Sequence, residues 1–195
     1  MSQLNPGKIE VELKARLKNP EQVEKEIIKK AKPVGEFIEE DIYFTFANTT
    51  GYQKQRFRLR RVQGKAIVTV KIEGKAEPGV EANQEFEFEI SDPQAFKVFC
   101  QEFGFRVLIE KKKKVKRFLF IPPEDEFSEK ITIELNQVEN LGYFLELETL
   151  VENQNQILPA SRYLKKLLRE FKIPLSQIES RPYTELLYEK IYPAS

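Results

Sequence analysis

The sequence predicts an α+β protein with a closed eight-stranded antiparallel β-barrel, a tunnel with a charged interior and helices packed on its outside. Three observations lead to this prediction. About eight segments alternate apolar and polar residues with the period of two that is typical of strands. Amphipathic segments indicate helices after the first strand, after the fifth and at the end of the chain. Short connections between most strands favour antiparallel pairing, and eight such strands are enough to close a barrel.

The first strand-like segment, IEVELKARL (9–17), places apolar residues on one face and charged residues on the other. The same division runs through seven further segments, which are EDIYFTF (40–46), QRFRLRRV (55–62), AIVTVKIE (66–73), QEFEFEI (84–90), EKKKKVKRFLF (110–120), KITIEL (130–135) and YFLELETL (143–150). Because nothing divides these segments into two groups, we expect a single domain over residues 1–195, with 152–195 as its helical C-terminal part.

The helical segments each carry one apolar face. They are NPEQVEKEIIKKA (19–31), SDPQAFKVFCQEFG (91–104), PASRYLKKLLREFK (159–172) and TELLYEKIY (184–192). The first two open with Asn or Asp followed by Pro, which is a common start of a helix. In the second, a stripe of Phe96, Phe99, Cys100 and Phe103 predicts that the single cysteine lies in the core.

The composition excludes several classes of function. The 32 Lys and Arg residues balance 31 acidic residues, so the net charge of +1 gives no overall basic field for nucleic acid. The absence of His removes serine-protease-type triads and His-ligated zinc. One Cys allows no internal disulfide and fits a reducing compartment. With no apparent signal peptide and no apolar run long enough to span a membrane, we expect a cytoplasmic protein.

The charges on the polar faces are sorted by sign within each strand. Arg56, Arg58 and Arg60 share one face, and so do the acidic residues at 85, 87 and 89. Side chains two positions apart on a strand lie roughly 7 Å from each other, so like charges there repel. A sequence selected only for solubility would mix the signs. The sorting suits a polyanion bound together with a hard cation such as Mg²⁺ or Mn²⁺, because bases contact the anion and clustered carboxylates bind the metal.

Seven motifs in order resemble those of the CYTH superfamily, which includes class IV adenylate cyclases and thiamine triphosphatases and is also described as triphosphate tunnel metalloenzymes. The motifs are the ExExK of Glu10, Glu12 and Lys14, EDIYF (40–44), FRLR (57–60), VTVK (68–71), EFEFEISD (85–92), NQVENLGYFLELE (136–148) and PYTELL (182–187). The resemblance implies a tunnel that holds a triphosphate and a divalent metal.

The resemblance also implies roles for individual residues. The expected ligands of Mg²⁺ or Mn²⁺ are Glu10, Glu12, Glu146 and Glu148. The expected phosphate-binding residues are Arg58, Arg60, Lys71, Lys114 and Lys116, and Glu85 and Glu87 are further tunnel acids. For the lysine-rich strand, the alternation favours Lys114 and Lys116 facing inward, whereas the spacing to Phe120 favours Arg117; we follow the alternation.

Three residues are expected to take part in catalysis: Lys14, Glu134 and Asn136. Asn136 occupies the place of an Asp in the family, and its amide can coordinate a metal but cannot act as a base. Glu134, on the same strand face, could compensate. Lys14 would contact the phosphates or hold the neighbouring acids. Two further departures from the family pattern are Asn83 in place of Arg and Pro182 in place of Ser.

The resemblance implies a metal-dependent enzyme acting on ATP, thiamine triphosphate or tripolyphosphate, with no nucleic-acid or membrane partner. The first candidate is an adenylate cyclase, which converts ATP to cyclic AMP and pyrophosphate. A thiamine triphosphatase or inorganic tripolyphosphatase is the alternative. A non-catalytic polyphosphate- or nucleotide-binding module is a further alternative, which Asn136 suggests. Nucleic-acid binding through KKKKVKR (111–117) is disfavoured by the charge balance. The C-terminal helices either cover the barrel or form a homodimer surface.

Overall fold

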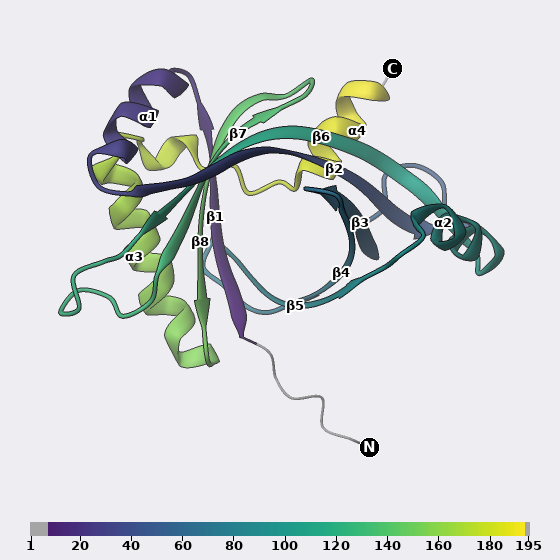
Figure 1. Ribbon diagram of the computed structural model, residues 1–195, viewed down its shortest axis with the longest axis horizontal. Helices are drawn as coiled ribbons and strands as arrows, with labels where there is room; N and C mark the ends of the chain where they lie inside the picture. Colours follow the sequence, from purple (N-terminus) through teal and green to yellow (C-terminus); the bar gives the residue numbers. More distant parts are fainter. Residues whose placement is uncertain (1–7, 194–195) are drawn as a thin grey trace.

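Eight antiparallel strands close into a barrel in the computed structural model, which describes residues 8–193 (Figure 1). The strands are β1 (Ile9–Leu17), β2 (Lys32–Phe46), β3 (Phe57–Val62), β4 (Lys65–Glu73), β5 (Glu81–Glu89), β6 (Phe105–Phe120), β7 (Ile131–Val138) and β8 (Gly142–Val151). Around the barrel they follow the order β1–β5–β4–β3–β2–β6–β7–β8. The predicted fold class is therefore confirmed.

Four helices lie outside the barrel (Figure 1). They are α1 (Pro20–Ile28), α2 (Pro93–Glu102), α3 (Ile157–Glu170) and α4 (Tyr183–Ile191), and short 3₁₀ turns lie at Gln154–Gln156 and Leu175–Gln177. The first two helices begin as their caps predict, since the Asn19 side chain accepts a hydrogen bond from the Gln22 amide and Asp92 accepts from Gln94 and Ala95. No helix within 8–193 combines the length and apolar character needed to cross a bilayer.

Strand β2 is longer than the sequence predicts, because it begins at Lys32 rather than at Glu40. The extra residues pair with the second half of β6, from Lys32 opposite Leu119, with an irregularity between Pro33 and Gly35. This segment has little alternation of its own. Its conformation comes from pairing with the 16-residue β6, so the tertiary context decides and not the local sequence.

The larger part of the apolar core lies outside the barrel, between the outward faces of β1, β7 and β8 and helices α1 and α3 (Figure 1). The apolar stripe of α3 supplies Ala160, Leu164, Leu167 and Leu168, each at most 1% exposed. The apolar strand faces therefore point outward and the charged faces inward, as predicted. Helix α3 covers the barrel, which is the first of the two roles considered for the C-terminal helices.

Helix α2 packs on the other half of the barrel, where Cys100 is buried with Phe44, Leu59 and Val68. The prediction that Cys100 lies in the core is confirmed. Phe96 of the same stripe packs against this cluster, whereas Phe99 is 52% exposed and Phe103 is 67% exposed. Helix α2 crosses the strands and only the side with Cys100 touches them, so one flank of the stripe faces solvent.

Candidate functional site

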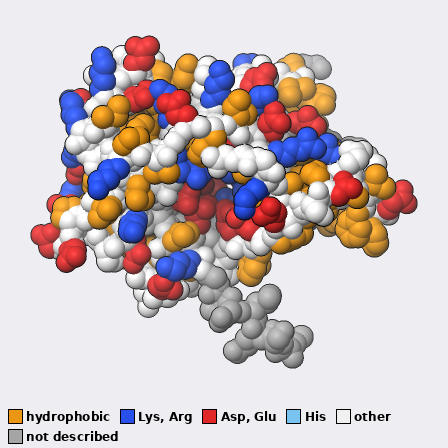
Figure 2. All heavy atoms as spheres, viewed as in Figure 1, with side chains coloured by type: hydrophobic (Ala, Val, Ile, Leu, Met, Phe, Trp, Pro, Cys, Tyr) orange, Lys and Arg blue, Asp and Glu red, His pale blue; other side chains and the backbone are white. Residues whose placement is uncertain are grey.

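The barrel encloses a cavity of about 300 Å³ to which all eight strands contribute charged or polar side chains. Nine acidic and nine basic residues line it, and Figure 2 shows both kinds of side chain within the hollow at the centre of the molecule. The predicted residues that line it are Glu10, Glu12, Lys14, Arg58, Arg60, Lys71, Glu85, Glu87, Glu134, Glu146 and Glu148. The sign-sorted strand faces thus converge on one enclosed space, where the low local polarity strengthens each electrostatic contact.

A row of carboxylates crosses three adjacent strands on one wall of the cavity. Glu12 of β1 lies opposite Glu148 of β8 on one side and opposite Glu81 of β5 on the other. Glu10 lies two residues further along β1, on the same face. Like charges directly opposite each other oppose strand pairing, so this row is unfavourable unless protons or a cation neutralise it.

The pKa values of three of these carboxyl groups reflect that cost. Burial, reinforced by neighbouring carboxylates, raises the pKa of Glu10 to about 9. The pKa of Glu12 and that of Glu148 are each raised to about 7, again chiefly by burial. Glu81 is absent from our predicted ligand set, although it lies two positions before Asn83 and shares the parity of Glu85 and Glu87.

Lys71 partly compensates this acidic wall. Its ammonium lies 3.1 Å from a carboxylate oxygen of Glu10 and also forms an ion pair with Glu85. Burial alone would lower the pKa of Lys71, but Glu10 and Glu12 outweigh it and raise the pKa above its usual value. A single ammonium therefore neutralises part of a cluster that contains several carboxylates.

Glu146 belongs to a different cluster from the other predicted metal ligands. The Lys113 ammonium lies 3.2 Å from Glu146, 2.8 Å from Glu134 and 3.3 Å from Glu39. Burial would raise the pKa of Glu146, but Lys113 and Lys111 outweigh it and hold the pKa below its usual range. Glu146 is thus already paired with a cation, whereas Glu148, two residues away, forms no ion pair within residues 8–193.

Asn136 shares the strand face of Glu134 and is completely buried, but it does not line the cavity. Its amide nitrogen donates a 2.7 Å hydrogen bond to Glu146, which fixes the orientation of that carboxylate. Its side-chain oxygen has no hydrogen-bond partner among residues 8–193. The placement supports a positioning role for Asn136 and does not support direct contact with a molecule in the cavity.

A buried ionic cluster on β2 and β3 was not found from the sequence. Asp41 accepts two hydrogen bonds from the Arg60 guanidinium, at 2.7 and 3.0 Å, and forms an ion pair with Lys111 at 2.9 Å. Burial would raise the pKa of Asp41, but Lys111 and Arg60 hold it well below its usual value. The signal was available in part, because Asp41 and Tyr43 alternate with the apolar Ile42 and Phe44 along β2.

Two cations in the cavity are only weakly neutralised. Arg58 donates to the Thr69 hydroxyl and approaches Glu87 at 3.7 Å, while its Nε finds no partner in the described part of the chain. The buried Lys14 ammonium lies 4.5 Å from the centre of the Tyr183 ring, and within residues 8–193 it makes no ion pair. Buried cations without full compensation favour the binding of an anion.

The predicted orientation of β6 is wrong. Lys114 and Lys116 point away from the cavity, and Lys116 forms a 2.7 Å ion pair with Glu24 of α1. The residues of β6 that line the cavity are Lys111, Lys113 and Arg117. Val115, which the alternation would place on the outer face, lies on the same face as Lys113 and is buried opposite Asn136.

An apolar cluster of residues from β7, β8 and α4 closes one end of the barrel. The rings of Phe144 from β8 and Tyr183 from α4 pack edge to face with centres 4.9 Å apart, together with Val138 and Leu186. The interior is therefore charged along most of its length and apolar at one end. Val115 lies opposite Asn136, and Asn136 lies opposite Phe144 of this cluster, so the inward face is apolar at Val115 as well.

The fold and the sequence match known proteins. The CYTH domain model matches residues 8–183. A Methanocaldococcus jannaschii protein named "Putative adenylate cyclase MJ0240" is 25% identical over 182 residues, which are 91% of this chain and 98% of that protein. The structure of PH1819 from Pyrococcus horikoshii has a TM-score of 0.74 and 28% identity, and the match covers 93% of this chain and 99% of that one.

A more distant structure shares the fold. It is that of HpAC1 from Hippeastrum, a "Putative adenylyl cyclase" that shows a dominant triphosphatase activity, with a TM-score of 0.61 and 14% identity. The match covers 94% of this chain and 96% of that protein. The family model spans most of the chain, and the closed charged barrel agrees with it. The protein belongs to the CYTH domain family.

Proposed function

We propose that this protein is a divalent-metal-dependent enzyme that acts on a triphosphate. The observation that carries the proposal is the arrangement of two complementary walls in one cavity. The carboxylates Glu81, Glu12 and Glu148 lie in a row on one side, and the weakly compensated cations Arg58 and Lys14 line the same space. Phosphoryl transfer asks the protein mainly for positioning and charge neutralisation, and this cavity supplies both.

The donor set fits a hard divalent cation such as Mg²⁺ or Mn²⁺. Carboxylate oxygens are the ligands these ions prefer, and Glu10, Glu12 and Glu148 would hold the ion. Among residues 8–193, no three acidic side chains yet converge around one point, and Glu10 is turned toward Lys71. A bound cation would neutralise phosphate oxygens and polarise the reacting phosphorus. The basic side chains would hold the remaining phosphate oxygens in place.

Adenylate cyclisation is the first candidate reaction. It is supported by the name of the M. jannaschii relative, which matches nearly the whole of both chains. In this reaction the 3′-hydroxyl of ATP attacks its α-phosphorus, and pyrophosphate leaves. A nucleotide also needs a surface for its base, and flat aromatic rings commonly provide one.

Hydrolysis of the triphosphate is the second candidate, and the aromatic residues of the cavity favour it. The ring of Tyr43 lies under Lys111, and that of Tyr183 lies under both Lys14 and Lys111. Phe57 already stacks on Phe44 with ring centres 4.9 Å apart. The described lining therefore offers little free aromatic surface for a base. The activity of HpAC1 is consistent with this alternative.

One experiment tests the proposal and separates the two reactions. The full-length protein is incubated with ATP, thiamine triphosphate or tripolyphosphate and either Mg²⁺ or Mn²⁺, and the products are identified by chromatography. Cyclic AMP with pyrophosphate supports cyclisation, whereas orthophosphate without a cyclic nucleotide supports hydrolysis. Glu12→Gln should lower turnover by at least about 100-fold, because it removes a central carboxylate of the row. The exposed Glu21→Gln on α1 is the matched control. Metal-dependent binding without turnover of any substrate would contradict an enzymatic role.

A further inference from the structure

The outer face of β4 and β5 carries apolar side chains that no helix of the described chain covers. Val70, Ile72 and Phe88 are exposed although they point away from the cavity, and Phe86 is half-buried between them. Val70 lies opposite Phe86, and Val68 lies opposite Phe88, so these side chains form one continuous surface. On the opposite half of the barrel, the equivalent surface is buried under α1 and α3 (Figure 1).

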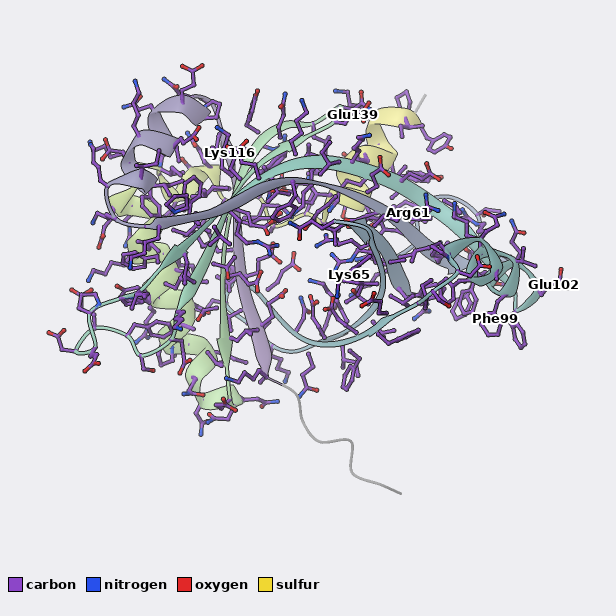
Figure 3. All side chains as sticks on the ribbon, viewed as in Figure 1. Arg61, Lys65, Phe99, Glu102, Lys116 and Glu139 are labelled. Atoms are coloured by element: carbon purple, nitrogen blue, oxygen red, sulfur yellow. The ribbon has the colours of Figure 1, made fainter. Side chains whose placement is uncertain are left out.

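The exposed flank of α2 extends this surface. The Phe99 ring stacks on Phe103 with centres 4.3 Å apart, and both rings are exposed. Figure 3 shows Phe99 on the same side of α2 as β4 and β5, and Figure 2 shows hydrophobic side chains gathered there. Contiguous exposed apolar patches of this kind mark interaction sites, because isolated monomers rarely maintain them. We define the β4–β5–α2 face as Val70, Ile72, Phe86, Phe88, Val98, Phe99 and Phe103.

We propose that the β4–β5–α2 face is the interface between two copies of this chain. In this arrangement α2 of each copy lies against the β4–β5 surface of the other, so the same patch serves both partners about a two-fold axis. In the closed barrel β4 and β5 each have a hydrogen-bonded neighbour on both sides, so the proposed contact is face to face and not an extension of the sheet.

The size of the patch agrees with what a stable dimer needs. Three Phe side chains at least half exposed, together with the exposed aliphatic residues, present roughly 500 Å² of apolar surface, taking about 150 to 250 Å² for a whole aromatic side chain. A standard interface buries about 800 Å² on each partner, of which about 60% is apolar. The β4–β5–α2 face therefore supplies the apolar part of one such interface.

The charges around the face favour a protein partner over a membrane or a nucleic acid. The outward-facing positions of β4 and β5, which are 66, 68, 70, 72, 84, 86 and 88, carry no charged side chain. Glu102 adds one exposed carboxylate beside Phe103. Anionic lipid surfaces and nucleic acids attract clusters of Lys and Arg, and this rim has no such excess. A strand surface without charged side chains can pair with its own copy without repulsion.

The test is the mass of the full-length protein in sedimentation experiments over a range of micromolar concentrations. We expect a species of about twice 22.9 kDa that dissociates on dilution. Phe99→Glu and Phe88→Glu should each shift the protein to the monomer, because each places a charge in the centre of the interface. Ile28→Glu and Val34→Glu, which alter exposed apolar residues outside the face, should leave the dimer intact.

Two further measurements keep the test decisive. Far-UV circular dichroism and thermal unfolding establish that each variant is folded. Amide hydrogen exchange of the wild-type protein should show slower exchange over 84–90 and 97–103 at high concentration than at low concentration. A wild-type protein that stays at 22.9 kDa throughout overturns the proposal, and binding of that monomer to lipid vesicles would assign the face to a membrane instead. A dimer that persists in both Phe variants also overturns it.

Discussion

At the scale of single residues, Glu12 shows how the chain maintains an arrangement that folding alone does not favour. It has a carboxylate opposite it on each neighbouring strand, Glu81 and Glu148, and the burial of the row adds a desolvation cost. Beside the cavity, buried acids are matched with bases, as Asp41 is with Arg60. A local arrangement that costs stability within an otherwise consistent fold is expected where a ligand supplies the missing compensation.

The raised pKa values of these acids predict how stability depends on pH. Because the pKa values of Glu10, Glu12 and Glu148 lie above the usual value of 4.5, the folded protein retains protons that the unfolded chain releases. Their contribution is fully present below about pH 4.5 and is lost as the pH rises through 7 and 9. The unfolding free energy of the metal-free protein should therefore fall between pH 5 and pH 9, measured by urea denaturation.

Two comparisons check the cause of this fall. Glu12→Gln should make the dependence shallower, since an amide cannot ionise, whereas Glu21→Gln on the surface of α1 should leave it unchanged. Saturating Mg²⁺ should also reduce the fall, because a cation that binds only the folded protein stabilises its deprotonated carboxylates. Stability that rises steadily from pH 5 to pH 9 would contradict the assignment of raised pKa values.

At the scale of elements, the period-two pattern was sufficient to locate every strand, the caps located the starts of α1 and α2, and the apolar face located α3. β1 matches its predicted range, and α1 and α2 begin at their predicted prolines. The first part of β2, from Lys32, was not predictable, because its pairing with β6 and not its own sequence makes it a strand.

The prediction of which face of β6 points into the cavity was wrong for a related reason. Its lysines occupy both faces of the strand, so neither face is clearly polar, and Val115 was a misleading marker because it is an apolar residue on the inward face, opposite Asn136. An alternation argument needs one face to be consistently apolar. β3 and β5 satisfy this condition, and the predicted Arg58, Arg60, Glu85 and Glu87 do line the cavity.

The corrected orientation of β6 makes a prediction about two adjacent residues. Arg117 lines the cavity, where it donates hydrogen bonds to Glu134, whereas Lys116 points outward to Glu24. If the cavity binds triphosphate, Arg117→Met should weaken tripolyphosphate binding by about tenfold, the worth of one charge-assisted contact. Lys116→Met should change it by less than about twofold. Isothermal titration calorimetry measures the tripolyphosphate affinity of both variants. A larger loss of affinity in Lys116→Met than in Arg117→Met would show that Lys116, and not Arg117, faces the cavity.

At the scale of the whole molecule, barrel closure creates the site, and the sequence alone could not show which residues meet. The row of Glu81, Glu12 and Glu148 brings together positions from β5, β1 and β8 that lie far apart in the chain. Their register depends on the pairing of all eight strands. Strand faces were predictable, so the composition of the cavity was largely predictable too. The neighbours of each side chain, such as Lys113 beside Glu146, were not.

The same closure ties the stability of the cavity to helices that do not touch it. Leu164 of α3 is fully buried in the cluster that covers β1, β7 and β8. Leu164→Ala should lower the unfolding free energy by about 2 to 5 kcal/mol. Leu158→Ala on the same helix, where the side chain is 41% exposed, should cost less than about 1 kcal/mol. Because β1 and β8 carry the carboxylate row, we expect one cooperative transition by both circular dichroism and tyrosine fluorescence. Separate transitions would show that α3 can detach while the barrel stays closed.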